Sequence, residues 1–598
     1  MSKYTIDDKT IETIIGFIKD KSIVIPEMQR PFVWKSTQVR DLIDSLYEEY
    51  PVGYLVVWQN PDVHDKATGR LSVGKQVLID GQQRVTALMA AICGEKVLDD
   101  DFQEKNIRIA YNPFPAEDEN RFEVLTAAIK KDRRWIPDIS VMFQSDFDLW
   151  TFVETYAAAN PDHTKSDINK AFIRVLSIKN RLIGLIVLEK GLSIDIVTEI
   201  FIRINSKGTP LNQADFVMST LAADEKHGGT LLRKSIDYFC HLAADNSFQR
   251  QIDKDDSFKG SEYYENIKWA ADGNMRIYSP AFEDVIRVAF ISQYERGRLA
   301  NLVDLLHGRN FQIMRYEEAI VKESFSRFSD GVKACQNQNM FKQFQEAIMS
   351  AGFIKEDMIR SRMAMDFAYA LFLRLYHSNF NEAVHFVRTW FAMSVLTGRY
   401  AGSPESVMDK DLRNIKDKGF EVCLAEALAN LSDTFWTITL PQNLQTASAT
   451  APAFLCFLAA QCRAGDDGFL GSGQKVRELL ETGDVHHLFP KEYLMSSGIR
   501  DKRDYNQVAN YVLLNRPTNI SIGKKAPTDY MHEIVDSLQN GTSSKYTCIN
   551  TMEDLLTNMR TNCIPTDFFD MDHTSYDLFI NKRRQLMAEK IRQWFKSL

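Results

Sequence analysis

The sequence predicts an α+β protein of several domains, with a mixed α/β N-terminal part, a mostly helical middle and short strands again near the C-terminus. The chain of 598 residues is too long for a single hydrophobic core. Its composition, with 44% hydrophobic and 25% charged residues, is that of an ordinary globular protein. The spacing of apolar residues changes along the chain, and we expect divisions at 1–220, 221–450 and 451–598.

The first part alternates strand-like and helix-like segments. Short, β-branched segments bounded by turn residues predict strands. These segments are 53–59, 76–80, 107–111 and 182–189. Segment 36–51 has apolar residues at helical spacing, with Ser36 as its expected N-cap and Pro51 as its stop.

From about residue 221, apolar residues recur every three to four positions, which predicts a helical array. Segment 440–452 is expected to be a linker within it. The most apolar stretch, 451–462, is too short to span a bilayer and predicts a buried helix. A basic amphipathic helix is expected at 576–595, either as a solvated face or as a set of phosphate contacts.

Charge and cysteine content narrow the function classes. The net charge of −8 excludes a protein that is basic throughout, so any polyanion site must be a local basic patch. The eight cysteines contain no CxxC pair, which favours reduced thiols over a zinc ribbon or a disulfide framework. The first twenty residues lack the apolar core of a signal peptide. We expect a cytoplasmic protein with no membrane partner.

Segment 77–94 predicts a strand, a tight turn containing Asp80 and Gly81, and a helix. The first turn of that helix carries three polar side chains: Gln82, Gln83 and Arg84. Unpaired N–H groups at a helix start, together with an arginine, suit a phosphate, and Gly81 lets it approach the backbone. The alternative is a surface turn with a salt bridge between Asp80 and Arg84, which the motif by itself favours.

Two other segments carry similar polar groups. Gln29 and Arg30 lie in a loop between prolines, shortly before Trp34. Segment 199–216 places three further candidates at an expected helix end: Arg203, Asn205 and Gly208. Each segment alone is consistent with ordinary capping.

Together these three motifs resemble the ParB-like domain of GmrSD-type, SspE-type and BrxU-type phage-defence proteins, over about the first 220 residues. The resemblance implies that an NTP, GTP or ATP, is bound and hydrolysed at the Asp80–Arg84 motif together with Gln29 and Arg30. It implies Arg84 and Arg30 on phosphates and Asp80 on a metal ion or a water. In some members this domain also senses modified DNA. The chain has no P-loop motif, so NTP hydrolysis would use this different cradle.

Two adjacent histidines, His486 and His487, end a predicted strand. A second strand is expected to open at Asn510, and a helix or tight turn to start at Asn519. Phosphodiester hydrolysis needs a neutral imidazole that takes a proton from water and a divalent metal ion with open positions. For the histidine pair alone, the alternative is two surface histidines near a turn.

The order strand, strand, helix with His, Asn and Asn resembles the HNH, or ββα-metal, nuclease domain that accompanies the ParB-like domain in those proteins. The resemblance implies that His487 is the general base, that Asn510 orients it, and that His486 and Asn519 hold the metal ion. The family usually has Asp or Glu where His486 stands. The metal is expected to be Mg, Mn or another transition ion. A nitrogen ligand favours the softer transition ions over Mg.

Lys524 and Lys525 flank this segment as candidate contacts to the DNA backbone. The two resemblances together predict an NTP-regulated, metal-dependent DNA endonuclease of a type IV-like, modification-dependent restriction system that acts on foreign or modified phage DNA. Further expected partners are a second copy of the chain and proteins of a defence operon. The alternatives are an NTP-hydrolysing DNA-sensing regulator whose HNH site is inactive or acts on RNA, and a pure NTPase regulator.

Overall fold

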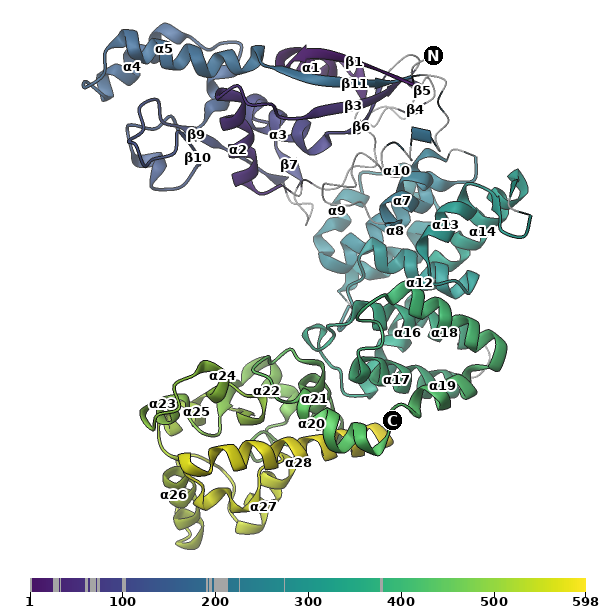
Figure 1. Ribbon diagram of the computed structural model, residues 1–598, viewed down its shortest axis with the longest axis vertical. Helices are drawn as coiled ribbons and strands as arrows, with labels where there is room; N and C mark the ends of the chain where they lie inside the picture. The colour runs from purple at the N-terminus through teal and green to yellow at the C-terminus, as the bar shows by residue number, and fades with distance from the viewer. Residues whose placement is uncertain are drawn as a thin grey trace. The chain divides into compact units, whose positions relative to one another are not determined.

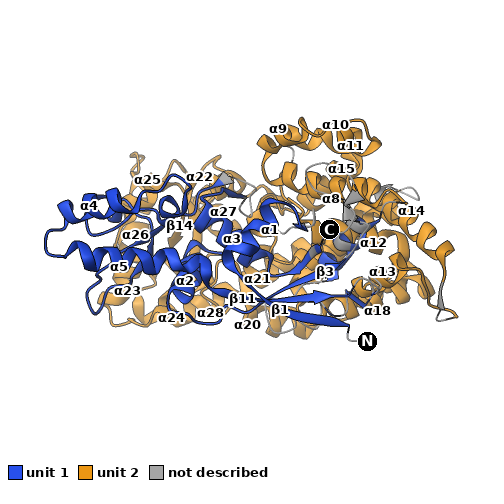
Figure 2. Cartoon of the chain, turned by 90° about the horizontal axis from the view of Figure 1, so that it is seen from above, with its two compact units in different colours: residues 1–225 blue, residues 226–598 orange. Residues whose placement is uncertain are grey.

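The structure is a computed structural model (Figure 1). It describes residues 3–24, 32, 34–59, 63–64, 71–72, 76–98, 104–189, 192, 196–197, 200, 213–224, 226–273, 275–313, 315–376 and 380–598. The chain forms two compact units, residues 1–225 and 226–598 (Figure 2). The expected boundary at 220 lies close to this division. The expected boundary at 450 falls inside the second unit, which therefore contains both the helical middle and the paired histidines.

A mixed five-stranded sheet with the order β1-β11-β3-β6-β2 forms the centre of the N-terminal unit. Its strands are β1 (Tyr4–Thr10), β2 (Ile23–Val24), β3 (Tyr54–Gln59), β6 (Gln76–Asp80) and β11 (Leu182–Leu188). Strand β3 pairs in parallel with β11 and antiparallel with β6. The strands predicted at 53–59, 76–80 and 182–189 are thus confirmed. The strand predicted at 107–111 is shorter, β9 (Ile109–Tyr111), and pairs with β10 (Phe122–Val124) in a separate sheet.

Helices of this unit pack their apolar stripes into one core with the sheet. They are α1 (Ile11–Lys19), α2 (Ser36–Tyr47), α3 (Gln82–Cys93), α4 (Leu149–Ala159) and α5 (Lys165–Leu176). A further helix of the unit is α7 (Gln213–Ala223). Helix α2 begins at Ser36 itself, so the expected N-cap was wrong by one position and Lys35 holds that place. The helix ends at Tyr47, before Pro51.

The C-terminal unit begins with the predicted helical array. Its longer helices are α8 (Gly229–Ala244), α12 (Phe282–Tyr294), α14 (Glu318–Cys335), α15 (Gln338–Ser350), α16 (Arg362–Leu375), α17 (Phe380–Thr397), α18 (Pro404–Lys418) and α19 (Phe420–Leu428). The linker expected at 440–452 is partly wrong, because a π-helical turn, Phe435–Thr439, runs into α20 (Leu440–Asn443). Leu440 is fully buried there, and packing of this side chain favours helix over linker.

Helix α21 (Pro452–Ala464) forms part of the core of this unit, as predicted for the apolar segment. Proline in its first turn suits a helix start, and Gly465, with a φ of 68°, ends it. Residues 453–462 are all buried. Across the described parts of both units, no helix has the length and apolar character needed to cross a membrane.

The last helix, α28 (Tyr576–Lys596), packs against α21. Three of its cations bind the protein itself rather than facing solvent. Arg583 is fully buried, Lys590 forms an ion pair with Asp466 at 2.6 Å, and Arg592 pairs with Asp433. These three side chains therefore serve the fold and do not form a phosphate-binding face.

The paired histidines lie on a small strand–strand–helix segment. Strand β14 (Asp484–His487) pairs antiparallel with β15 (Tyr511–Leu514), and α25 (Arg516–Ile522) follows directly. The predicted order of two strands and a helix is therefore present.

Candidate functional site

The two histidines lie on opposite faces of the β14–β15 pair, because neighbouring side chains of a strand alternate between faces. His486 is opposite Val512 in the register, and His487 is opposite Tyr511. Asp484 shares the face of His486, two residues away. Helix α25 contributes Asn519 to this same face, where it contacts both side chains.

His486 is buried, with 3% of its surface exposed. Its Nδ1 donates to Oδ1 of Asn519 at 2.7 Å, and Nδ2 of Asn519 donates to Oδ2 of Asp484 at 3.2 Å. Burial lowers the pKa of His486 to about 4, so the ring is neutral at pH 7. A neutral imidazole that donates from Nδ1 keeps a lone pair at Nε2, and this buried atom has no hydrogen-bond partner among the described residues.

A buried imidazole, an amide oxygen and a carboxylate lie here in one hydrogen-bonded chain, and each is a group that can serve as a ligand of a divalent ion. Nowhere in the described chain do three or more His, Cys, Asp or Glu side chains form a group suited to a metal ion. A metal site at this place would therefore need the amide of Asn519 as well as His486 and Asp484. A nitrogen ligand such as His486 would favour manganese or another transition ion over magnesium in such a site.

His487 lies on the other face and is held by a different side chain. Its Nε2 donates to Oδ1 of Asn506 at 2.9 Å, and its ring packs edge-on against Tyr511 with centroids 5.0 Å apart. Burial lowers the pKa of His487 from its ordinary value of 6.5, and the charge of Lys491 lowers it further, while the Asn506 contact opposes the shift. With the proton on Nε2, Nδ1 carries the lone pair that a general base requires.

Asn510 does not orient the His487 ring through a side-chain hydrogen bond, which corrects the expected role. It precedes β15, in the 3₁₀ turn Val508–Asn510, and does not open the strand itself. Its side chain is fully buried and holds the backbone that follows the histidines. Oδ1 accepts from the N–H of Phe489 at 2.9 Å, and Nδ2 donates to the carbonyl of Phe489 at 3.0 Å and to that of Tyr505 at 3.3 Å.

Two more distant side chains hold the same turn. The hydroxyl of Tyr530 donates to the carbonyl of Leu488 at 2.8 Å. The buried guanidinium of Arg583 donates to the carbonyl of Ala509 at 2.7 Å. The turn after His487 is therefore fixed by groups from three separate parts of the C-terminal unit.

Sequence reasoning missed Asp484 and Asn506. The position of Asp484, two residues before His486 on an expected strand, is a usable signal, because residues i and i+2 share a face. Asn506 lies in the irregular segment before β15 and gives no such signal.

The two flanking lysines differ. Lys525 hydrogen-bonds to Glu533 and, at 2.7 Å, to the hydroxyl of Tyr546, and its contact lowers the pKa of Glu533 to about 2. Lys524 is exposed and has no ion-pair partner among the described residues. Lys524 is therefore the better candidate for contact with a phosphate backbone.

In the N-terminal unit, the predicted strand, turn and helix are present. Gly81, at a φ of 96°, joins β6 to α3, and an added Cβ would lie 2.3 Å from Cδ2 of Leu55. The guanidinium of Arg84 donates to the carbonyl of Tyr54 and lies 3.8 Å from the carboxylate of Asp80. The salt bridge between Asp80 and Arg84, which was the alternative to a phosphate site, is thus present, although its N–O distance is long.

The first turn of α3 receives no side-chain cap. The two predictions for this motif, a phosphate site and a salt-bridged surface turn, are therefore compatible. Gln82 and Gln83 lie half-buried in that turn. Trp34 is partly buried against the core of the unit, 6.5 Å from the ring of Phe32. The other N-terminal candidates lie outside the described residues: Gln29, Arg30, Arg203, Asn205 and Gly208.

Replacement of Asn510 by alanine is expected to destabilise the C-terminal unit by about 2–3 kcal/mol, because it leaves the buried N–H of Phe489 unpaired. Amide hydrogen exchange in the peptide covering 487–490 is expected to accelerate, while Asn540→Ala, at the exposed C-cap of α26 (Pro527–Gln539), leaves it unchanged. Equal exchange in the two variants would show that Asn510 does not fix this turn.

Two comparisons with known proteins bear on this architecture. Residues 11–222 match the family described as the N-terminal domain of the GmrSD restriction endonuclease. The chain is also similar to an uncharacterized protein of Methanocaldococcus jannaschii, at 21% identity over 648 aligned positions that cover 98% of each chain. The first match spans most of the N-terminal unit and its Asp80–Arg84 motif. The N-terminal unit is therefore similar to the N-terminal domain of GmrSD restriction endonucleases.

Proposed function

We propose that the chain is a metal-dependent HNH-type DNA endonuclease whose cleavage centre lies on β14, β15 and α25. The observation that carries the proposal is the division of the histidine pair between two faces. His486 meets Asn519 at 2.7 Å on one face, and the neutral His487 is held by Asn506 on the other. Two unrelated surface histidines would not each be expected to bond a separate, partly buried asparagine amide.

In this proposal His487 accepts a proton from the attacking water at Nδ1, while Asn506 holds its other nitrogen. His486 and Asn519, with Asp484 beside them, would hold the divalent ion. Such an ion supplies Lewis-acid stabilisation of the phosphate and of the leaving oxygen. Lys524 would contact the phosphate backbone, which adds affinity but no sequence reading.

The N-terminal unit is proposed to bind and hydrolyse GTP or ATP and to regulate cleavage, in a type IV-like, modification-dependent system of anti-phage defence. The uncapped first turn of α3, which starts after Gly81 at a φ of 96°, and the cation of Arg84 support a phosphate site. Foreign or modified DNA, a second copy of the chain and proteins of a defence operon are the proposed partners.

We expect His487→Ala to lower plasmid nicking at least a hundredfold in Mn²⁺, since a general base contributes about 10²–10⁴ in rate. The measurement is the rate of supercoiled-plasmid conversion by the full chain in Mn²⁺ and in Mg²⁺. The control is His532→Ala, which removes an exposed histidine that pairs with the exposed Asp570, at 3.4 Å.

If His487→Ala cuts as fast as the His532→Ala control, the nuclease assignment is wrong. The chain would then be the regulator considered above, with an inactive centre or one that acts on RNA. A second variant is His486→Asp, which replaces a nitrogen ligand by an oxygen ligand. The nicking rate in Mg²⁺ divided by the rate in Mn²⁺ is expected to rise in this variant.

Arg84→Ala is expected to weaken nucleotide binding by tenfold or more, since a charge-assisted hydrogen bond contributes about 1.5–3 kcal/mol. Binding and turnover of GTP and of ATP are measured, with thermal unfolding as a check because Arg84 also bonds Tyr54. The matched control is Arg108→Ala, a half-exposed arginine of the same unit that pairs with Asp138. Nucleotide turnover that is equal in both variants argues against a phosphate site at Arg84.

A further inference from the structure

A cavity of about 310 Å³ lies within the C-terminal unit, against the β14–β15 pair that carries the histidines. One wall is formed by that pair, through Val485 and Leu513 among others. Val485 shares its strand face with His487, so the cavity adjoins the candidate nuclease centre. Its volume suits one small molecule, since ligand pockets begin at about 300 Å³.

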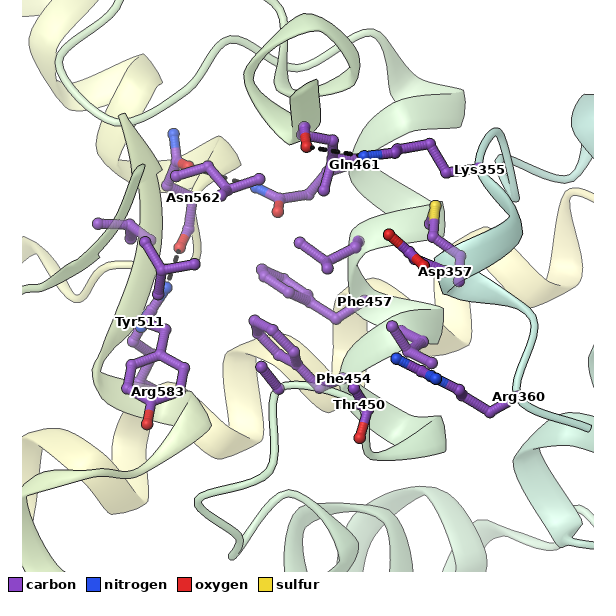
Figure 3. A pocket seen from close by; sticks show the side chains of 18 residues that line it. Lys355, Asp357, Arg360, Thr450, Phe454, Phe457, Gln461, Tyr511, Asn562 and Arg583 are labelled. Atoms are coloured by element: carbon purple, nitrogen blue, oxygen red, sulfur yellow. Dashed lines mark hydrogen bonds between the residues drawn. The ribbon is translucent and has the colours of Figure 1, made fainter. Parts of the chain in front are cut away.

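Two aromatic rings of α21 line the middle of the cavity. Phe454 and Phe457 are stacked with their planes 25° apart, and both are almost fully buried from outside solvent. Figure 3 shows them between a charged side with Lys355, Asp357 and Arg360 and an opposite side with Asn562, Tyr511 and Arg583. Flat apolar surfaces of this kind accept a planar ring.

A hydrogen-bonding group faces the same space. Gln461 is buried, and its Nε2 donates weakly to Oδ1 of Asn562, at 3.3 Å. Its Oε1 has no partner in the part of the chain that the structure describes, and Figure 3 shows this oxygen directed toward the rings. Such a group can accept a hydrogen bond from the edge of a planar heterocycle.

The charged groups around the cavity favour an anion. Three cations and one carboxylate line it: Lys355, Arg360, Arg583 and Asp357. The three cations lack an ion-pair partner within the described residues, and Lys355 has only the carbonyl of Leu480, at 3.2 Å. Arg583 is fully buried, binds carbonyl oxygens alone and has an unpaired Nε. Arg583 therefore serves the fold, and the cations available to a bound anion are Lys355 and Arg360.

We propose that this cavity binds one nucleotide, with its base against Phe454 and Phe457 and its phosphate at Arg360 and Lys355. An apolar floor, an inward amide oxygen and an excess of cations at the rim together match a planar heterocycle joined to an anion. The nucleotide is either a free mononucleotide or one turned out of a DNA strand, and the chemistry that recognises it is the same. The proposal does not depend on catalysis at His487, because it concerns binding alone.

The test is isothermal titration calorimetry on the full chain carrying His487→Ala and Arg84→Ala, so that neither cleavage nor the proposed N-terminal nucleotide site contributes. The probes are deoxycytidine and deoxyguanosine monophosphates, the corresponding nucleosides, and 2-deoxyribose 5-phosphate. We expect at least one mononucleotide to bind, and its nucleoside and the sugar phosphate to bind at least tenfold more weakly, since each lacks half of the recognised chemistry.

Three further substitutions localise the site. Arg360→Glu is expected to weaken binding at least tenfold, and Thr450→Trp, at the exposed rim, to abolish it by filling the cavity. Arg477→Glu makes the same charge change on α22 (Val476–Thr482), away from the cavity lining, and is expected to leave affinity unchanged. The proposal would be overturned if none of the mononucleotides binds. It would also be overturned if one binds and neither Arg360→Glu nor Thr450→Trp changes its affinity.

A short single-stranded oligonucleotide distinguishes the two sources. If it binds more tightly than the mononucleotide and loses that affinity in Thr450→Trp, the site accepts a nucleotide of a DNA strand. If Thr450→Trp weakens binding of the mononucleotide but not of the oligonucleotide, the site accepts a free nucleotide.

Discussion

The buried carboxamide of Asn510 is the constraint on which the candidate nuclease centre depends. Its oxygen and nitrogen both bind the backbone of Phe489, and its own carbonyl accepts from the N–H of Leu488 at 2.8 Å. A buried amide of this kind must have its hydrogen bonds, or its desolvation is not offset. The direction in which the chain leaves His487 is therefore set by a residue more than twenty positions later, and Arg583 extends this dependence to the last helix.

The two histidines are both kept neutral by burial, but they have different neighbours. Desolvation lowers the pKa of both, and each is ordered by a separate asparagine, Asn519 or Asn506. The HNH pattern that this segment resembles usually has a carboxylate at the position of His486. Here a carboxylate is present on the same strand face, at Asp484, two residues earlier. In the proposed HNH assignment the acidic group therefore lies two residues earlier, and His486 adds a nitrogen to the oxygen donors.

Local patterns predicted much of the fold and part of the site. The β-branched runs, the helical spacing around 36–47 and the strand–turn–helix at Gly81 are short-range signals, and each corresponds to an element of the structure. The hydrogen bond between His486 and Asn519 joins residues that the expected strand–strand–helix order already brought together. Contacts that depend on tertiary packing did not follow from the sequence. Asn506 lies in irregular chain, and the basic residues of α28 gave no sign that they turn inward.

In the proposed nuclease centre, one divalent ion is held between β14 and α25, beside His486 and Asn519. The most direct measurement is anomalous X-ray scattering at the manganese edge from crystals of the full chain grown with Mn²⁺. We predict an anomalous peak within coordinating distance of both side chains in the wild-type chain and its loss in His486→Ala. A peak elsewhere in the C-terminal unit, or a wild-type peak that persists in His486→Ala, would contradict the account.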